Sequence, residues 1–300
     1  MIRRSLVPLD ASPRSESVLP TAVNIAAKLG AELQIAMVHV PGAYAVDPPL
    51  EDFDRDALAA GRVYLDAVAA RVKQLFPGPL KVHLLEGLVP ETLATEAVAQ
   101  EIDLLVMNAH GWGFVSRSIL GSVSDYLMRH IRIPMLLMHC KPGEEACQPI
   151  QFDRVLICLD GSPLSATILQ PASSIGDIWQ SELHLLRVVS PPAHSLESFN
   201  SERRQQYEAL YDNAGAEARK YLEQVASKLS SGSSKVSLQI AKSRNPAEAI
   251  LHEAHNAKCD RIAISTNGRG GLARLLMGSV ADKVIRGAET PVLVYHPPGD

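Results

Sequence analysis

Two glycine-containing loops are the stretches of this sequence whose residue types and spacing are best suited to chemistry. Each follows an apolar run, contains a glycine, continues for nine residues and closes on a Gly-Ser pair before a helix-like segment; the pairs are Gly111 with Gly121-Ser122 and Gly268 with Gly278-Ser279. A strand, a glycine loop and a helix start can present backbone N–H groups and the positive end of a helix to an anion. The sequence therefore predicts two related anion-binding loops, at residues 108–123 and 265–280.

A carboxylate accompanies each loop. Asp10 and Asp160 each end the first predicted strand of their half, directly before Ala-Ser and Gly-Ser. Ligands of open α/β sheets bind outside the carboxyl ends of the strands, where a carboxylate can accept hydrogen bonds from a sugar hydroxyl or a base amine. A role as a turn acceptor is the alternative. Neither loop has the Walker A or Gly-x-Gly-x-x-Gly pattern, so these general motifs identify no nucleotide.

The remaining reactive side chains form no catalytic pattern. His39, His83 and His184 fall within strand-like runs and are interpreted as structural histidines. His252 and His255 lack the His-Glu-x-x-His spacing of a zinc site, and no serine lies in a Gly-x-Ser-x-Gly elbow. We predict no catalytic residue and no metal site.

The elements that must position the loops occur twice. Residues 5–12 return as 155–162, residues 32–40 as 182–189, and residues 103–107 as 260–264. In each half, short strands rich in Val, Ile and Leu alternate with helical segments, which is typical of a doubly wound α/β sheet. We predict one domain over residues 1–140, a polar linker with two prolines over 141–152, and a second domain over 153–300.

Bulk composition narrows the class of partner. The 300 residues carry a net charge of −4 with no long basic run, which argues against nucleic acid. No window approaches the ~20 apolar residues of a membrane span, and the first ten residues do not form a signal peptide. These features predict a cytoplasmic protein that binds neither nucleic acid nor membrane.

With these motifs in view, the chain resembles a tandem universal stress protein, with two family domains in one polypeptide. The family loop reads Gly-x-x-Gly, nine residues, then Gly-Ser or Gly-Thr; both copies match except at the first glycine, where Asn108 and Ser265 stand. The resemblance extends to the two aspartates, to His39-Val40 with its counterpart Arg187-Val188, and to the apolar strands after Pro134 and Pro291.

The resemblance implies a fold and a ligand. Each half is expected to be a five-stranded parallel sheet in the order 3-2-1-4-5, and the last strands are expected to pair the halves as an internal pseudo-dimer, with a homodimer of whole chains left open. ATP, or AMP or ADP, is the expected ligand, with or without Mg²⁺. The residues carried over from the family's binding site are Asp10, Val40, Asn108, His110, Gly111, Gly121, Ser122, Val123 and Ser124 in the first half, and Asp160, Val188, Ser265, Asn267, Gly268, Gly278, Ser279, Val280 and Ala281 in the second.

The leading functional hypothesis is a stress-response module that binds an adenine nucleotide and acts as a sensor or interaction partner. A nucleotide-free dimerisation scaffold and a slow ATP hydrolase are the alternatives. The second loop keeps a small serine at its first position, whereas the first loop carries Asn108 and the bulkier residues 111–114. If only one site binds nucleotide, we expect it to be the site at Gly268.

Overall fold

The computed structural model describes residues 2–42, 51–109, 120–139, 152–191, 201–229, 235–268 and 277–297. His110, Gly111 and almost all of the predicted linker lie outside these ranges. Apart from a few C-terminal residues, the chain divides into two compact units between residues 150 and 151. Each unit contains one copy of the repeat and is described by itself.

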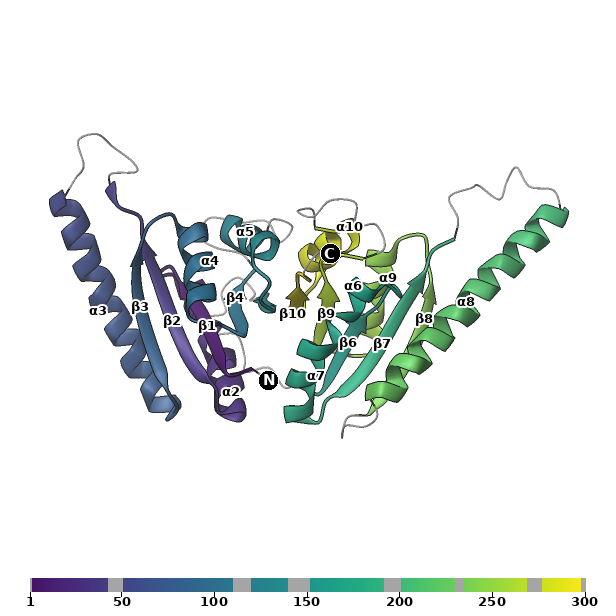
Figure 1. The fold of residues 1–300 in the computed structure, drawn as a ribbon, viewed down its shortest axis with the longest axis horizontal. Coiled ribbons are helices and arrows are strands. Elements are labelled where there is room, and N and C mark those ends of the chain that lie inside the picture. The colour runs from purple at the N-terminus through teal and green to yellow at the C-terminus, as the bar shows by residue number, and fades with distance from the viewer. Residues whose placement is uncertain are drawn as a thin grey trace. The chain divides into compact units, whose positions relative to one another are not determined.

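The first half alternates strands and helices along the chain (Figure 1). Its elements are β1 (Arg4–Leu9), α1 (Pro13–Glu16), α2 (Leu19–Leu29), β2 (Glu32–His39), α3 (Glu51–Leu75), β3 (Leu80–Glu86), α4 (Val89–Ala99), β4 (Leu104–Asn108), α5 (Ser122–His130) and β5 (Met135–Met138).

The second half repeats this order. Its elements are β6 (Arg154–Cys158), α6 (Pro163–Ala166), α7 (Leu169–Trp179), β7 (Glu182–Val189), α8 (Ser201–Leu229), β8 (Val236–Lys242), α9 (Pro246–Asn256), β9 (Arg261–Ser265), α10 (Ser279–Gly287) and β10 (Val292–Tyr295).

The strand order confirms the predicted fold class. It is β3-β2-β1-β4-β5 in the first half and β8-β7-β6-β9-β10 in the second, and the registered strand pairs are parallel. The central strands β4 and β9 are buried along their whole length because helices cover both faces of the sheet. The strand order reverses between the first and fourth strands of each half, which opens a crevice at their carboxyl ends.

Helix positions follow from local sequence signals. The side chains of Ser12 and Ser162 accept hydrogen bonds from the N–H groups of Ser15 and Ser165, at 3.0 and 3.1 Å, and a proline begins each short helix. Helices α1 and α6 last only four residues before α2 and α7 begin. The long helices α3 and α8 each lie along the two outermost strands of their sheet, as Figure 1 shows.

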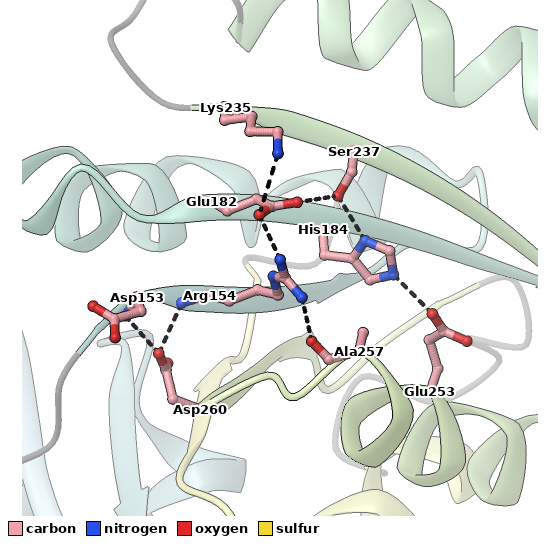
Figure 2. A network of polar contacts seen from close by, with 9 residues as sticks. All are labelled: Asp153, Arg154, Glu182, His184, Lys235, Ser237, Glu253, Ala257 and Asp260. Atoms are coloured by element: carbon pink, nitrogen blue, oxygen red, sulfur yellow. Dashed lines mark hydrogen bonds and ion pairs between the residues drawn. The ribbon is translucent and has the colours of Figure 1, made fainter.

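A polar network joins the strands of the second half near their amino ends (Figure 2). Glu182 accepts from Arg154 at 2.7 Å and from Ser237 at 3.0 Å, while the ring of His184 lies between Ser237, at 2.7 Å, and Glu253 on α9, at 2.9 Å. Ser237, His184 and Glu253 are thus hydrogen-bonded in the order serine, histidine, carboxylate, as in a catalytic triad. Because the hydroxyl of Ser237 donates to Glu182 rather than facing a ligand, we interpret the network as the attachment of α9 to the sheet.

The other two strand histidines are also paired with carboxylates. His39 Nε2 lies 3.0 Å from Asp54 on α3, and His83 Nδ1 lies 3.2 Å from Glu96 on α4. Each pair joins a strand to the helix that covers it. The structure therefore agrees with the structural role predicted for His39, His83 and His184.

Candidate functional site

The crevice of the second half lies where the chain leaves β6 and β9. The two strands pair in parallel, with Cys158 opposite Ile264, so Asp160 and Ser265 emerge side by side at the carboxyl edge. Ligands of open α/β proteins bind at this position. The structure thus brings together the carboxylate and the loop that the sequence placed more than a hundred residues apart.

A cavity of about 720 Å³ occupies this edge. Its size falls within the roughly 300–1,000 Å³ of small-molecule sites. All of the residues predicted for the second site line it, namely Asp160, Val188, Ser265, Asn267, Gly268, Gly278, Ser279, Val280 and Ala281. These residues come from four segments of the chain, and the tertiary structure gathers them around one volume.

A tight turn fixes the carboxylate of Asp160. Its Oδ1 accepts a hydrogen bond from Ser162 N at 2.8 Å, and its own N–H donates to Ser165 Oγ at 3.2 Å. Gly161 permits the turn with a φ of +86°. The turn uses one carboxylate oxygen, so the turn-acceptor and ligand roles weighed for Asp160 are compatible. The second oxygen, Oδ2, is directed at Gly268, and a β-carbon at position 268 would overlap it.

The second glycine of the loop starts helix α10. Gly278 N donates to the carbonyl of Thr266 at 2.7 Å, and a β-carbon at position 278 would lie 2.9 Å from that same oxygen. Gly278 is the N-cap, and no side chain caps the helix. The first turn of α10 therefore presents N–H groups to the cavity at the end where an anion is stabilised.

The hydroxyl of Ser265 is a buried group that a ligand could satisfy. Ser265 is 6% exposed and lines the cavity, yet its Oγ has no hydrogen-bond partner among the described residues. A buried hydroxyl without a partner costs about 1–3 kcal/mol. This position carries the first glycine in the family pattern, so Ser265 supplies a donor and acceptor that the pattern lacks.

Sequence reasoning did not assign a ligand role to Arg187, which also lines the cavity. Arg187 lies on β7, is 9% exposed, and its guanidinium carbon is 5.2 Å from the ring centroid of Tyr221 on α8. In the first half, Leu9 pairs with Met37 on the neighbouring strand. In the second half, the N–H of Leu159 donates to the carbonyl of the residue just before Arg187. Met37 is therefore the structural counterpart of Arg187. An arginine at a strand position where the other half has a methionine is the sequence signal that could have identified Arg187.

The same registers correct one pairing made from sequence. Arg4 pairs with Glu32, and Arg154 pairs with Glu182, so the second strands match without a gap. Val188 therefore corresponds to Val38, and the proposed match of Val40 with Val188 is wrong by two residues. Val40 lies beyond the end of β2 and is 43% exposed.

The crevice of the first half has the same carboxylate turn. Asp10 Oδ1 accepts from Ser12 N at 3.0 Å, and Ala11 adopts a φ of +62° where the second half has glycine. Gly121 caps α5 and donates to Ala109 O at 2.9 Å. The predicted residues Ser122 and Val123 lie in the first turn of α5. The backbone frame of the two crevices is thus shared where both are described.

Asn108 distinguishes the first crevice from the second. Its Nδ2 donates to the carbonyl of Arg14 on α1 at 3.3 Å, and its backbone carbonyl accepts from Ser124 Oγ at 3.2 Å. The amide side chain thus spans from the end of β4 to α1, across the crevice. Ser265 is too short to make the corresponding bridge, which leaves that space to the cavity.

Neither described cysteine is poised for reaction. Cys158 and Cys259 are free and buried, and burial raises the pKa of both thiols, with the charge of Arg154 only partly offsetting the effect at Cys259. A protonated thiol is a poor nucleophile and metal ligand. Within the described ranges, no group of three His, Cys, Asp or Glu side chains is arranged to hold a metal ion, and no helix is long and apolar enough to span a membrane.

Together the fold and the crevice define an open α/β protein with a cavity at the topological switch point of its second half. The universal stress protein family matches the chain twice, over residues 1–139 and 151–296, and the chain belongs to this family. Both the family and the tandem arrangement expected from the loops are therefore confirmed.

Individual relatives are distant. A universal stress protein of Mycobacterium tuberculosis is 26% identical over 208 residues, which span 66% of this chain and only 63% of the relative's length. A second protein of that family from the same organism is 24% identical over 319 residues, covering 98% of this chain and 95% of the relative. The crystal structure of a universal stress protein from Archaeoglobus fulgidus superimposes with a TM-score of 0.69 at 21% identity, covering 99% and 97% of the two chains, and shows the shared fold.

Proposed function

We propose that the second half binds an adenine nucleotide, ATP or AMP, in the cavity between Asp160 and α10. One observation carries the proposal: every residue expected at the second site lines a single cavity of about 720 Å³. The N-terminus of α10 and the glycine loop suit the phosphates, and the carboxylate of Asp160 suits a ribose hydroxyl or a base amine. The hydroxyl of Ser265 gains the hydrogen-bond partner that it lacks.

We propose further that the protein works as a nucleotide-responsive sensor or interaction module and not as a catalyst. The edge strands β5 and β10 are apolar, and pairing between them would protect two edges that otherwise invite association. Pairing of the halves, further dimerisation and a cytoplasmic location remain predictions. Sedimentation of the purified chain with and without ATP tests the dimer directly.

For the first half, the structure favours the alternative function of a dimerisation scaffold that binds no nucleotide. The side chain of Asn108 reaches from the end of β4 to α1, where the second half has the shorter Ser265. We therefore propose that one chain binds one nucleotide, and that the first half contributes to assembly. Isothermal titration with a stoichiometry near two would contradict this assignment.

Thermal unfolding with ATP and Mg²⁺ tests nucleotide binding. A ligand at a hundredfold excess over its Kd stabilises the folded state by about 2.7 kcal/mol, so wild-type protein should show a clear upward shift in Tm. Gly278→Val should abolish the shift, whereas the matched change Gly121→Val in the first half should leave it intact. Repeating the titration with EDTA shows whether Mg²⁺ contributes.

The nucleotide carried by freshly purified protein provides an independent test. Mass spectrometry of a deproteinised extract should detect an adenine nucleotide in wild-type protein and none in Gly278→Val. If wild-type protein carries no nucleotide and shows no thermal shift at millimolar ATP, the second half is a scaffold like the first.

A further inference from the structure

The cavity of the second half has a cationic end that the nucleotide-binding loops do not explain. Arg187 lies on β7, whereas the loop and the helix α10 N-terminus follow β9. The order β7-β6-β9 places two strand spacings, roughly 10 Å, between them. A nucleotide whose phosphates lie at α10 would therefore extend its base toward β7.

The side chain of Arg187 is held in place by aromatic packing. Its guanidinium carbon lies 5.2 Å from the centroid of the Tyr221 ring, and the residue is 9% exposed while lining the cavity. Tyr221 on α8 thus covers the guanidinium from one side, and the cavity lies against the same side chain. A planar cation on an aromatic ring loses little freedom on binding and can stack on a second flat ring.

The surroundings of Arg187 suit a flat apolar ring rather than phosphates. The cavity is also lined by Val188 and Val189 from β7, Ala214 from α8, and Pro246 and Ile250 from α9. These side chains provide apolar surface and no additional cation. Glu217 also lines the cavity, and its negative charge would repel a phosphate placed beside it. The anionic groups of a ligand therefore belong at the α10 end.

We infer that Arg187 is a specificity-determining residue that binds the purine ring by stacking, with Tyr221 behind it. The inference rests on the proposed function, since it concerns the base of the same nucleotide. It assigns the two ends of the cavity separate tasks: the glycine loop and α10 hold phosphates, and the Arg187–Tyr221 pair selects an aromatic base. The first half, with Met37 at the matching strand position, lacks this pair.

Calorimetric titration of the full chain with three probes tests the inference: ATP, adenosine and inorganic tripolyphosphate. Arg187→Met copies the first half and should weaken ATP and adenosine by about tenfold, within the range for a desolvated cation on an aromatic ring. Tripolyphosphate binding should stay unchanged, because the α10 end is intact. Met37→Arg in the first half is the matched control and should alter none of the three affinities.

A second variant separates stacking from charge. Arg187→Lys keeps the positive charge but loses the planar group, so it should weaken adenosine nearly as much as Arg187→Met. It also keeps the inference testable if Arg187→Met fails to fold, which circular dichroism would reveal.

Two results would overturn the inference while leaving nucleotide binding in place. One is an equal loss of tripolyphosphate and ATP affinity in Arg187→Met, which would make Arg187 a phosphate ligand. The other is unchanged adenosine binding in both variants. If wild-type protein binds neither ATP nor adenosine, the proposed function fails as well.

Discussion

Asp160 faces Gly268 so closely that position 268 has no room for a β-carbon beside the carboxylate Oδ2. Residues that follow the first and fourth strands of the second half thus approach each other closely at the crevice. At the second glycine of the loop, a side chain would clash with backbone instead. A β-carbon at position 278 would lie 2.9 Å from the carbonyl oxygen of Thr266. A carboxylate can rotate, whereas a carbonyl within the loop cannot.

This difference predicts distinct effects for two alanine substitutions. Gly268→Ala should displace the Asp160 side chain and reduce ATP affinity at least about tenfold, or 1.4 kcal/mol, with little change in Tm. Gly278→Ala should reduce affinity and also lower the unfolding free energy by about 1–3 kcal/mol, as overpacking does. Calorimetry and urea denaturation measure the two effects. Equal stability losses in both variants would contradict this account.

Asp160→Asn should separate ligand binding from turn formation. The amide oxygen can still accept the hydrogen bond from Ser162 N, so the unfolding free energy should change by less than about 0.5 kcal/mol, as for ordinary surface changes. Loss of the charged acceptor should weaken ATP by about 1.5–3 kcal/mol, the usual range for a hydrogen bond to a charged group. Asp10→Asn is the matched control and should leave ATP affinity unchanged.

A single substitution in the second half can reproduce the amide side chain that distinguishes the first crevice. Ser265→Asn should let the new amide reach across to α6, as Asn108 reaches Arg14 O on α1. The bridge would fill part of the cavity and should lower ATP affinity at least about tenfold. Ser265→Ala, which keeps the space open, should lose less affinity and is the control. Undiminished binding by Ser265→Asn would show that the bridge does not close a crevice.

Arg261 and Asp260 should respond unequally to substitution. Burial lowers the pKa of Arg261 to about 10, with the nearby charge of Asp260 only partly offsetting the effect, and the corresponding residue in the first half is Leu104. Arg261→Leu should change the unfolding free energy by less than about 1 kcal/mol, because Asp260 keeps its hydrogen bonds from Asp153 N and Arg154 N. Asp260→Ala removes these bonds and leaves the buried cation uncompensated, so it should cost about 3–5 kcal/mol. Fluorescence of Trp179 during urea denaturation, in a Trp112→Phe background, reports on this half. A large loss in Arg261→Leu would contradict the prediction.

Glu182 should make the second half sensitive to acid. Burial disfavours its ionised form, but hydrogen bonds from Arg154 and Ser237 and the charge of Lys235 outweigh burial and lower the pKa below 4.5. A carboxylate with a lowered folded-state pKa contributes stability above its unfolded pKa, and this contribution is lost as pH falls through the folded-state value. Glu182→Gln should therefore lose less stability than wild type as the pH falls from the ordinary pKa of a glutamate through the lowered folded-state pKa of Glu182.

Urea denaturation at a series of pH values measures this effect. Glu32 in the first half also has a lowered pKa, because burial is outweighed by hydrogen bonds from Gln34 and Lys81, so Glu32→Gln should behave alike. Identical acid profiles for wild type and both variants would show that neither carboxylate controls acid stability.

The sequence by itself determined the repeat, the α/β class and the resemblance to the family, because these depend on patterns that recur along the chain. The strand order followed only from what that resemblance implies. The spacing of Gly268 and Gly278, and the aspartate before a serine-proline cap, are local signals that identify a loop and a turn. The match of Val40 with Val188 is corrected by the strand registers, which pair Arg4 with Glu32 and Arg154 with Glu182 without a gap.

Only the tertiary structure decided how the two crevices differ. Whether Asn108 closes a crevice depends on the distance from its amide to a carbonyl on α1, and that contact joins residues 94 positions apart. The placement of Arg187 beside Tyr221 and the cavity likewise depends on how α8 packs on β7. Side-chain reach and packing across strands leave no periodic trace in a single sequence, so these features emerge only once the chain is folded.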